Sequence, residues 1–131
     1  LRLEPGYAEA QTNLAVAHNG LGAALGDQGK AEEAIDHYVQ ALRLQPGLAD
    51  AHANLARALA GRGRPDEAIR EILEAVRLQP RDADLHYDAA VLLVRAGRAT
   101  EAVPHLRTVL ALAPTHAEAR RAMDALTAPH D

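Results

Sequence analysis

The feature that most constrains the fold is a proline that recurs every 34 residues, at Pro46, Pro80 and Pro114. Four further sets of residues keep the same spacing: Gly29, Gly63 and Gly97; Glu33, Glu67 and Glu101; Ala34, Ala68 and Ala102; and Leu44, Leu78 and Leu112. A fixed period of this length is typical of stacked repeat arrays. Such an array presents a long surface rather than one catalytic pocket, so the sequence directs the search for function toward a binding partner.

The composition indicates helices and offers little catalytic chemistry. The chain of 131 residues has room for three to four two-helix units, and about three are needed to bury a continuous core. It is rich in Ala and Leu and poor in β-branched residues, which favours helix over strand. The sequence contains no Ser and no Cys, the two commonest covalent nucleophiles. We therefore expect no enzymatic activity from this chain and no thiolate metal site.

The charge and hydropathy of the chain limit the kinds of partner it can bind and the compartments in which we expect it. A net charge of −4 argues against nucleic-acid binding, which usually requires a basic surface. No apolar run approaches the roughly 18 residues of a membrane span, so we expect no membrane contact. No signal segment opens the chain, which favours the cytoplasm, although Leu1 is not an initiator methionine and upstream sequence could carry a signal.

Each 34-residue unit contains two apolar-periodic segments. In the central unit Leu55 and Leu59 lie on one helical face, while Ile69 and Ile72 lie on another. The segment Gly63–Asp66 between them has the glycine and proline that end one helix and start the next. The pattern therefore predicts a helix pair in every unit.

Three in-register motifs identify a family that these units resemble. The tetratricopeptide repeat has the pattern W-x2-L-G-x2-Y, then A-x3-F, then P. The three units read His18-x2-Leu21-Gly22-x2-Leu25, Ala34-x3-Tyr38, Pro46; then His52-x2-Leu55-Ala56-x2-Leu59, Ala68-x3-Ile72, Pro80; then His86-x2-Ala89-Ala90-x2-Leu93, Ala102-x3-Leu106, Pro114. The departures from the pattern replace aromatic residues with histidine or aliphatic residues and leave the period unchanged. The resemblance implies an all-α, right-handed solenoid of stacked antiparallel helix pairs, with about seven helices.

The two ends of the sequence resemble parts of further repeats. Leu1–Pro5 matches Leu42–Pro46, so the chain is expected to begin in the tail of a preceding repeat. Ala117–Leu126 has the pattern of one more first helix, with a more polar outer face, and is expected to cap the array. The expected divisions are a tail over 1–6, repeats over 7–48, 49–82 and 83–116, and a capping helix and tail over 117–131.

One step of the repeat is longer than the others. Pro5 and Pro46 are 41 residues apart, seven more than the regular period. Seven residues are nearly two helical turns, so a first helix lengthened by about 10 Å would keep its apolar face. The alternative is a helix that breaks at His18-Asn19-Gly20, because three nearby glycines disfavour helix. We favour the continuous helix and leave the break open.

The resemblance implies a concave groove, lined by the first helices, that binds peptide segments of partner proteins. The polar and apolar residues that point away from the second helices are Thr12, Asn13, Asn19, Asp50, Asn54, Arg57, Asp84, Tyr87, Asp88, Val91, Arg95, Glu118 and Arg121. Asn13 and Asn54 are similar to the groove asparagines of O-linked N-acetylglucosamine transferase repeats, which contact an extended peptide backbone. The alternative for both residues is a solvated polar helix face.

An acidic residue recurs near the start of each first helix, at Glu9, Asp50, Asp84 and Glu118. These carboxylates could attract a basic partner. We favour a structural explanation, in which each lies in the first helical turn and is stabilised by the helix dipole. Some tetratricopeptide co-chaperones bind acidic C-terminal tails through lysine and arginine clamps. Asp84 and Asp88 stand near the positions where such a clamp needs cations, which argues against that subtype.

Histidines also recur with the period, at His18, His52 and His86. Equivalent residues of stacked helix pairs lie on the order of 10 Å apart, whereas Zn–N bonds are about 2.0–2.1 Å. One histidine per unit therefore cannot form a shared metal site, and we expect half-buried rings that replace the family's aromatic residue. His37 and His105 are expected on the outer face of the second helices, with no evident chemistry.

A proline falls inside the expected second helix of the third unit, at Pro104. We predict Thr100 as the N-cap of this helix, which places Pro104 near the first turn. Proline is best tolerated there, because the first amides of a helix have no intrahelical partner.

The sequence therefore predicts a protein-interaction scaffold that binds a protein or peptide partner and needs no metal or cofactor. Two alternatives remain open. The chain could be the substrate-presenting repeat region of a larger enzyme, such as an O-linked glycosyltransferase, or it could be a self-assembling repeat module.

Overall fold

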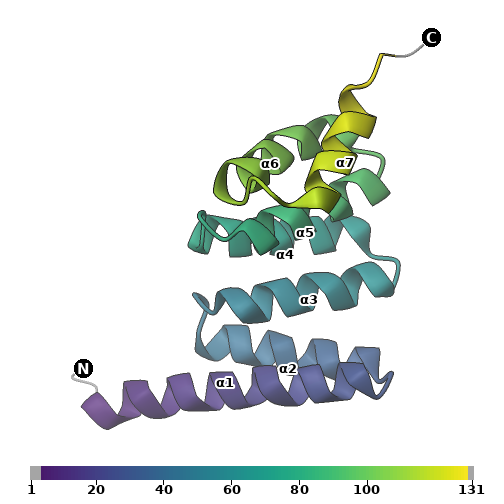
Figure 1. Ribbon diagram of the computed structural model, residues 1–131. Helices are drawn as coiled ribbons and strands as arrows, with labels where there is room; N and C mark the ends of the chain where they lie inside the picture. The colour runs from purple at the N-terminus through teal and green to yellow at the C-terminus, as the bar shows by residue number, and fades with distance from the viewer. Residues whose placement is uncertain (1–3, 130–131) are drawn as a thin grey trace.

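The computed structural model describes residues 4–129, which form seven helices and no strand. They are α1 (Pro5–Asp27), α2 (Ala31–Leu44), α3 (Ala49–Gly61), α4 (Pro65–Leu78), α5 (Ala83–Arg95), α6 (Ala99–Leu112) and α7 (Ala117–Thr127). Figure 1 shows them stacked in chain order, with α1 at one end and α7 at the other. The predicted all-α solenoid is confirmed. Most of the expected Leu1–Pro5 repeat tail lies outside the described residues.

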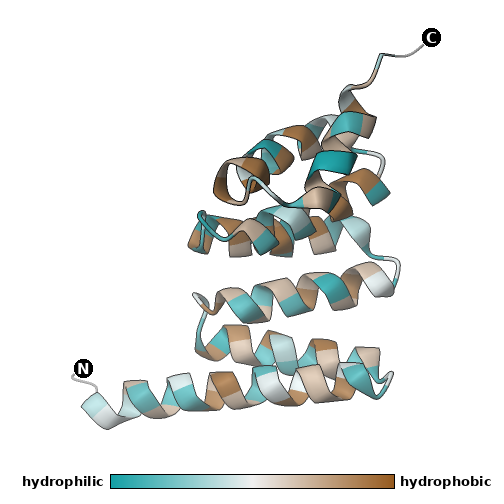
Figure 2. Ribbon diagram, viewed as in Figure 1, coloured by the Kyte–Doolittle hydropathy of each residue, from teal (hydrophilic) through white to brown (hydrophobic). Residues whose placement is uncertain are grey.

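The helices pack as antiparallel pairs that stack on their neighbours. The closest packing is within α1–α2, α3–α4 and α5–α6, and each pair then contacts the next through α2–α3, α4–α5 and α6–α7. In Figure 2 apolar and hydrophilic residues alternate along the helices, as amphipathic helices require. Helices α2 to α6 thus each pack both on the other helix of their pair and on a helix of a neighbouring unit.

The recurring glycines end the first helix of each pair. Gly29, Gly63 and Gly97 have φ values of 78°, 75° and 76°, in the left-handed region that favours glycine. The amide of the following residue bonds back across the turn, as in Arg64 N to Leu59 O at 3.0 Å. This is the Schellman arrangement, which satisfies the last carbonyls of the helix. The glycine period therefore reflects a backbone requirement rather than a side-chain contact.

The apolar core runs from α2 to α7 without interruption. Its largest fully buried side chains are Ile69, Ile72, Leu93, Leu106 and Val109. The small residues predicted at close helix approaches are buried as well, and Ala68 and Ala102 are both 0% exposed.

The long first helix is continuous. α1 runs for 23 residues without interruption, so of the two alternatives the break at His18-Asn19-Gly20 does not occur. Its N-terminal half projects past α2 (Figure 1). Tyr7, Leu14, Val16 and Leu21 remain about half exposed on it.

Two expectations about helix starts are wrong. Glu9 is not in a first turn, because α1 begins at Pro5. Thr100 is not the N-cap of α6, because Arg98 is, and Pro104 therefore lies inside the helix. The start of α6 at Ala99 keeps the 34-residue register with Pro65 at the start of α4. The repeat register, rather than the capping preference of threonine, sets this boundary.

Gly22 allows close contact between α1 and α2. A Cβ placed there would lie 2.6 Å from Cε1 of Tyr38 and 3.1 Å from the carbonyl oxygen of Ala34. The equivalent positions hold Ala56 with Ile72 in the second unit and Ala90 with Leu106 in the third. Glycine thus accompanies the one unit in which the opposing side chain is an aromatic ring.

Replacing Gly22 with alanine is therefore expected to destabilise the chain, although alanine is the better helix former. Overpacking costs about 1–3 kcal/mol, and the gain in helix propensity offsets up to about 1 kcal/mol of that. Urea unfolding followed by circular dichroism measures the net effect. In a Tyr38→Ile background, where the ring is gone, the same substitution should be neutral or stabilising. Equal effects in both backgrounds would contradict the contact.

Candidate functional site

A chain of polar contacts joins the first helices of the three pairs. Asn54 Nδ2 donates to Asn19 Oδ1 at 3.0 Å, linking α3 to α1. Arg57 Nη1 donates to Asn54 Oδ1 at 2.9 Å, and Arg57 Nη2 donates to Asp88 Oδ2 of α5 at 2.8 Å. We call Asn19, Asn54, Arg57 and Asp88 the polar ladder. It runs along the stack and crosses from one repeat to the next.

The ladder orients groups more than it stabilises the fold. The Arg57 and Asp88 side chains are 57% and 30% exposed, so water screens their attraction. Exposed ion pairs of this kind typically contribute about 0–1 kcal/mol. The ladder's donors and acceptors therefore remain available to exchange their present partners for those of a ligand.

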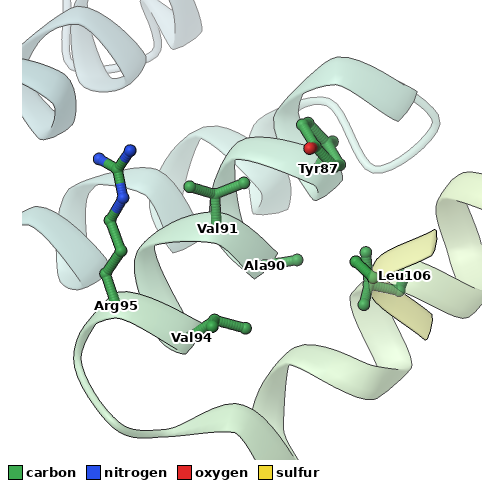
Figure 3. Close-up of a pocket in the computed structure, with 7 residues that line it drawn as sticks. Tyr87, Ala90, Val91, Val94, Arg95 and Leu106 are labelled. Atoms are coloured by element: carbon green, nitrogen blue, oxygen red, sulfur yellow. The ribbon is translucent and has the colours of Figure 1, made fainter. Parts of the chain in front are cut away.

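An apolar pocket lies at the C-terminal end of the ladder (Figure 3). Its lining residues come from α5, α6 and α7 and are Tyr87, Ala90, Val91, Val94, Arg95, Leu106 and Ala122. In Figure 3 Leu106 of α6 points toward the α5 residues across the cavity. The cavity holds about 210 Å³. That is below the roughly 300–1,000 Å³ of small-molecule sites and suits a single inserted side chain. We call this the Tyr87 pocket.

Two more hollows continue from the Tyr87 pocket along the first helices. The hollow between α3 and α5 measures about 370 Å³ and shares Val91 and Arg95 with the Tyr87 pocket. The hollow between α1 and α3 measures about 390 Å³ and shares Arg57 and Gly61 with the preceding one. Because neighbouring hollows share residues, the three form one continuous groove from α1 to α7.

Charges around the groove are mixed. Burial raises the pKa of Tyr87, with the Glu118 carboxylate adding to the rise and Arg121 opposing it. The Tyr87 ring also packs against His116, with ring centroids 4.7 Å apart. Arg95 is exposed and forms no ion pair within residues 4–129. The α5–α7 end of the groove therefore offers an apolar pocket beside a free guanidinium.

Family profiles match most of the chain. A profile described as tetratricopeptide repeat matches residues 13–81, which is more than half of the 131 residues, and a second profile with the same description matches residues 54–117. The chain belongs to the tetratricopeptide repeat family. Tetratricopeptide repeats are in general interaction modules rather than enzymes. No curated protein matches the chain.

Solved tetratricopeptide repeat structures share its fold. The first repeat domain of Spaghetti (RPAP3), bound to the HSP90 peptide SRMEEVD, has a TM-score of 0.80 at 22% identity and covers 88% of this chain and 94% of its own. The second repeat domain of Spaghetti, bound to the same peptide, scores 0.73 at 26% identity, covering 79% and 98%. YrrB, described as having an unusual peptide-binding site, scores 0.78 at 23% identity, covering 86% and 58%.

Seven of the thirteen residues selected from the sequence belong to the polar ladder or line the three hollows. The polar ladder accounts for four of them, and Tyr87, Val91 and Arg95 line the hollows. Glu118 and Arg121 lie near enough to Tyr87 to affect its pKa. Asn19, Glu118 and Arg121 line none of the three hollows themselves. The remaining selected residues, which neither line a hollow nor belong to the polar ladder, are Thr12, Asn13, Asp50 and Asp84.

The residues outside the hollows have identifiable environments. Thr12 Oγ1 donates to the carbonyl oxygen of Ala8 at 3.1 Å and lies 3.4 Å from Gln45 Oε1. Asn13 is exposed and makes no side-chain hydrogen bond within residues 4–129. Asp50 and Asp84 are exposed in the first turns of α3 and α5. Asn19, rather than Asn13, is thus the α1 partner of Asn54.

The histidines form contacts that the sequence did not predict. His37 and His105 are not free on an outer face, because their Nδ1 atoms lie 3.0 Å and 3.1 Å from Nδ1 of His18 and His86. In each unit the first-helix histidine meets the residue 19 positions later on the second helix. That offset could have signalled the contact. Within the described residues, no three potential ligands cluster in a way that could hold a metal ion.

No helix in residues 4–129 combines the length and the apolar character that crossing a membrane requires.

Proposed function

We propose that this chain is an interaction scaffold that binds an extended peptide segment of a partner protein in the groove from α1 to α7. The observation that carries the proposal is the sharing of residues between successive hollows, which makes the groove continuous over all the first helices. A preformed groove lowers the ordering cost of binding, because the protein side is already fixed.

The chemistry of the groove suits a peptide backbone. Asn19 and Asn54 carry amides that donate and accept hydrogen bonds at once, as a backbone of any sequence requires. They are already aligned along the stack, so a strand-like peptide could exchange contacts with both. This part of the groove would contribute affinity without strong sequence preference.

The Tyr87 pocket would give the groove its preference for particular peptide sequences. An apolar side chain would fill its cavity, and a neighbouring acidic residue would pair with the free guanidinium of Arg95. The peptide bound by the two Spaghetti domains, SRMEEVD, combines apolar and acidic residues. The proposal does not include a lysine and arginine clamp for the C-terminal carboxylate of a peptide. Arg57 would be a cation of such a clamp, and its charge is already neutralised by Asp88.

Removing the groove contacts is expected to weaken binding more than tenfold, since buried interface anchors typically contribute above about 1 kcal/mol each. The test variant combines Asn54→Ala, Arg57→Ala and Tyr87→Ala. Affinity capture with the wild-type chain identifies the partner, and calorimetry with its peptide measures the loss. The matched control is Glu74→Ala with Arg77→Ala, which removes an exposed pair on α4 outside the groove. If the groove variant and the wild type recovered the same partners equally, the groove assignment would fail.

The same groove could present substrates to a catalytic domain elsewhere in a longer protein. The full-length gene distinguishes this possibility, because it requires a domain of the glycosyltransferase type on the same polypeptide.

Self-association is a second candidate, and the exposed face of α1 favours it. Leu14 and Leu21 are 50% and 48% exposed, whereas the equivalents of Leu21 in the next two units, Leu55 and Ala89, are buried. Their helices α3 and α5 each pack on the second helix of the preceding unit. The α1 face therefore fits an apolar helix of a second copy. Light scattering at high concentration tests this, and a monomer would contradict it.

A further inference from the structure

Each repeat contains a crossed pair, in which a first-helix histidine contacts the residue 19 positions later on the second helix. The three pairs are His18–His37, His52–Glu71 and His86–His105, with contact distances of 3.0, 2.7 and 3.1 Å. The geometry is the same in every unit, but the chemistry differs. The central pair joins an imidazole to a carboxylate, and the other two join imidazole to imidazole.

A second hydrogen bond fixes the protonation of the ring in the second and third units. His52 Nε2 lies 2.9 Å from the carbonyl oxygen of Pro46, and His86 Nε2 lies 2.7 Å from that of Pro80. A carbonyl oxygen can only accept, so Nε2 must carry a proton in both rings. The other nitrogen, Nδ1, is then free to respond to its partner on the second helix.

The two kinds of partner, a carboxylate and an imidazole, place different requirements on the protonation of Nδ1. A carboxylate also only accepts, so His52 donates from both nitrogens when it is the charged imidazolium. Between His86 and His105, by contrast, one Nδ1 must donate and the other must accept. The pair can hold one shared proton at this contact. When both rings are charged, each carries a proton on Nδ1, so two N–H groups and two positive charges face each other.

We propose that the crossed pairs make the array pH-sensitive unit by unit, so that mild acid loosens the α5–α6 pair of the third repeat while it strengthens the α3–α4 pair of the second. His86 is only 7% exposed, so water cannot readily relieve a clash between charged rings there.

The direction of the pKa shifts agrees with this geometry. Burial, reinforced by the charge of His86, lowers the pKa of His105 below its ordinary value of 6.5. The folded state therefore binds fewer protons than the unfolded state, and stability present above pH 6.5 is lost as the pH falls below it. The hydrogen bond to Glu71 raises the pKa of His52, against the opposing effect of burial. That contribution is present below pH 6.5 and is lost as the pH rises through the folded pKa.

The other charged groups on the helices packed around His86 and His105 are either engaged or exposed. Those engaged elsewhere are Asp82 with the Leu85 amide, Asp88 with Arg57, Glu101 with Arg98, Glu67 with Arg64, Glu74 with Arg77, Glu71 with His52, and Glu118 and Arg121 beside Tyr87. Those exposed are Asp66, Arg70, Asp84, Arg95, Arg107, Arg120 and Asp124. The direct contact of each of the two rings across the pair is therefore with the other ring.

Loosening of the α5–α6 pair would also alter the groove. Tyr87 follows His86 in α5, and Leu106 follows His105 in α6, and both line the Tyr87 pocket. Loosening of α5 from α6 would therefore deform the pocket in mild acid. This consequence rests on the proposed function, whereas the test below measures only the fold.

Exchanging the two kinds of pair tests the proposal. His105→Glu gives the third unit the imidazole–carboxylate pair of the second, and Glu71→His gives the second unit the imidazole pair of the third. The quantity compared is the fall in melting temperature between about pH 7.5 and about pH 5.5, in the presence of a chelator. His105→Glu should reduce that fall by about 2–4 °C, and Glu71→His should enlarge it by a similar amount. Ala111→Glu, which adds a carboxylate on an exposed side of α6, should leave it unchanged.

A measurement on the wild-type chain covers the case in which a variant fails to fold. NMR titration of the ring protons should give His105 a midpoint below 6.5 and His52 a midpoint above it. Amide hydrogen exchange, corrected for its intrinsic pH dependence, should show α5 and α6 losing protection in acid relative to α3 and α4. Equal midpoints, uniform protection, or both swapped variants moving the melting difference in the same direction would overturn the proposal.

Discussion

Truncation of Ile72 to alanine is expected to lower the free energy of unfolding by about 2–5 kcal/mol. Ile72 is 0% exposed in α4 and belongs to the core that links the helix pairs. The substitution removes apolar contacts and leaves a cavity that the close-packed helices cannot fill without moving apart. Since globular proteins have total stabilities of about 5–15 kcal/mol, the loss is a large part of the whole.

Urea unfolding followed by circular dichroism measures this loss. Arg70→Ala is the control, because Arg70 lies on the same helix but is exposed, and its replacement should change stability by no more than about 0.5 kcal/mol. If both variants unfolded at the wild-type urea concentration, Ile72 would not occupy the core.

The period was sufficient to predict the fold because it fixes which residues are equivalent. Ala68 and Ala102 are both fully buried, as equivalent positions in a stack should be. The glycine period marked where helices end, and those residues do adopt left-handed backbone. The start of α6 was harder to predict, because Thr100 is a good capping residue and only the register with α4 shows that Arg98 takes that place.

The sequence could predict which residues lie on the exposed face of the first helices, but not which of them contact one another. The resemblance selected Asn54, Arg57 and Asp88, which do meet along the first helices. It also selected Asn13 together with Asn54 as asparagines that contact a peptide, whereas the α1 residue that is hydrogen-bonded to Asn54 is Asn19. The contact joins residues 35 apart, one more than the period, so it depends on how the lengthened α1 is rotated against α3. A repeat alignment has no information on that rotation.

The histidine pairs were missed for a related reason. A 34-residue alignment compares each position with its equivalents in other units, so it shows that His18, His52 and His86 recur. It does not show which side chains meet inside one unit. The second-helix partners are equivalent to one another in the alignment, but they are not identical, being His37, Glu71 and His105. Because the residue type varies, the alignment did not mark this position as a contact of the first-helix histidine.

The substitution Ala68→Phe is expected to destabilise the chain by about 3 kcal/mol or more, which is the upper limit of the usual cost of overpacking. Ala68 is 0% exposed, and the equivalent Ala34 lies close enough to α1 for its carbonyl oxygen to be 3.1 Å from a Cβ at Gly22. A phenyl ring at this position must force α3 and α4 apart. Because these helices form the central pair, the displacement would weaken their packing on α2 and α5 as well.

A thermal melt compares Ala68→Phe with Ala111→Phe, which adds the same ring at an exposed position on α6. The control should melt within a few degrees of the wild type, since surface substitutions usually change stability by no more than about 0.5 kcal/mol. An Ala68→Phe variant that melted with its control would mean that α3 and α4 do not approach closely at this residue. The 34-residue alignment that makes Ala34, Ala68 and Ala102 equivalent would then be wrong, and with it the stacking that makes the groove continuous.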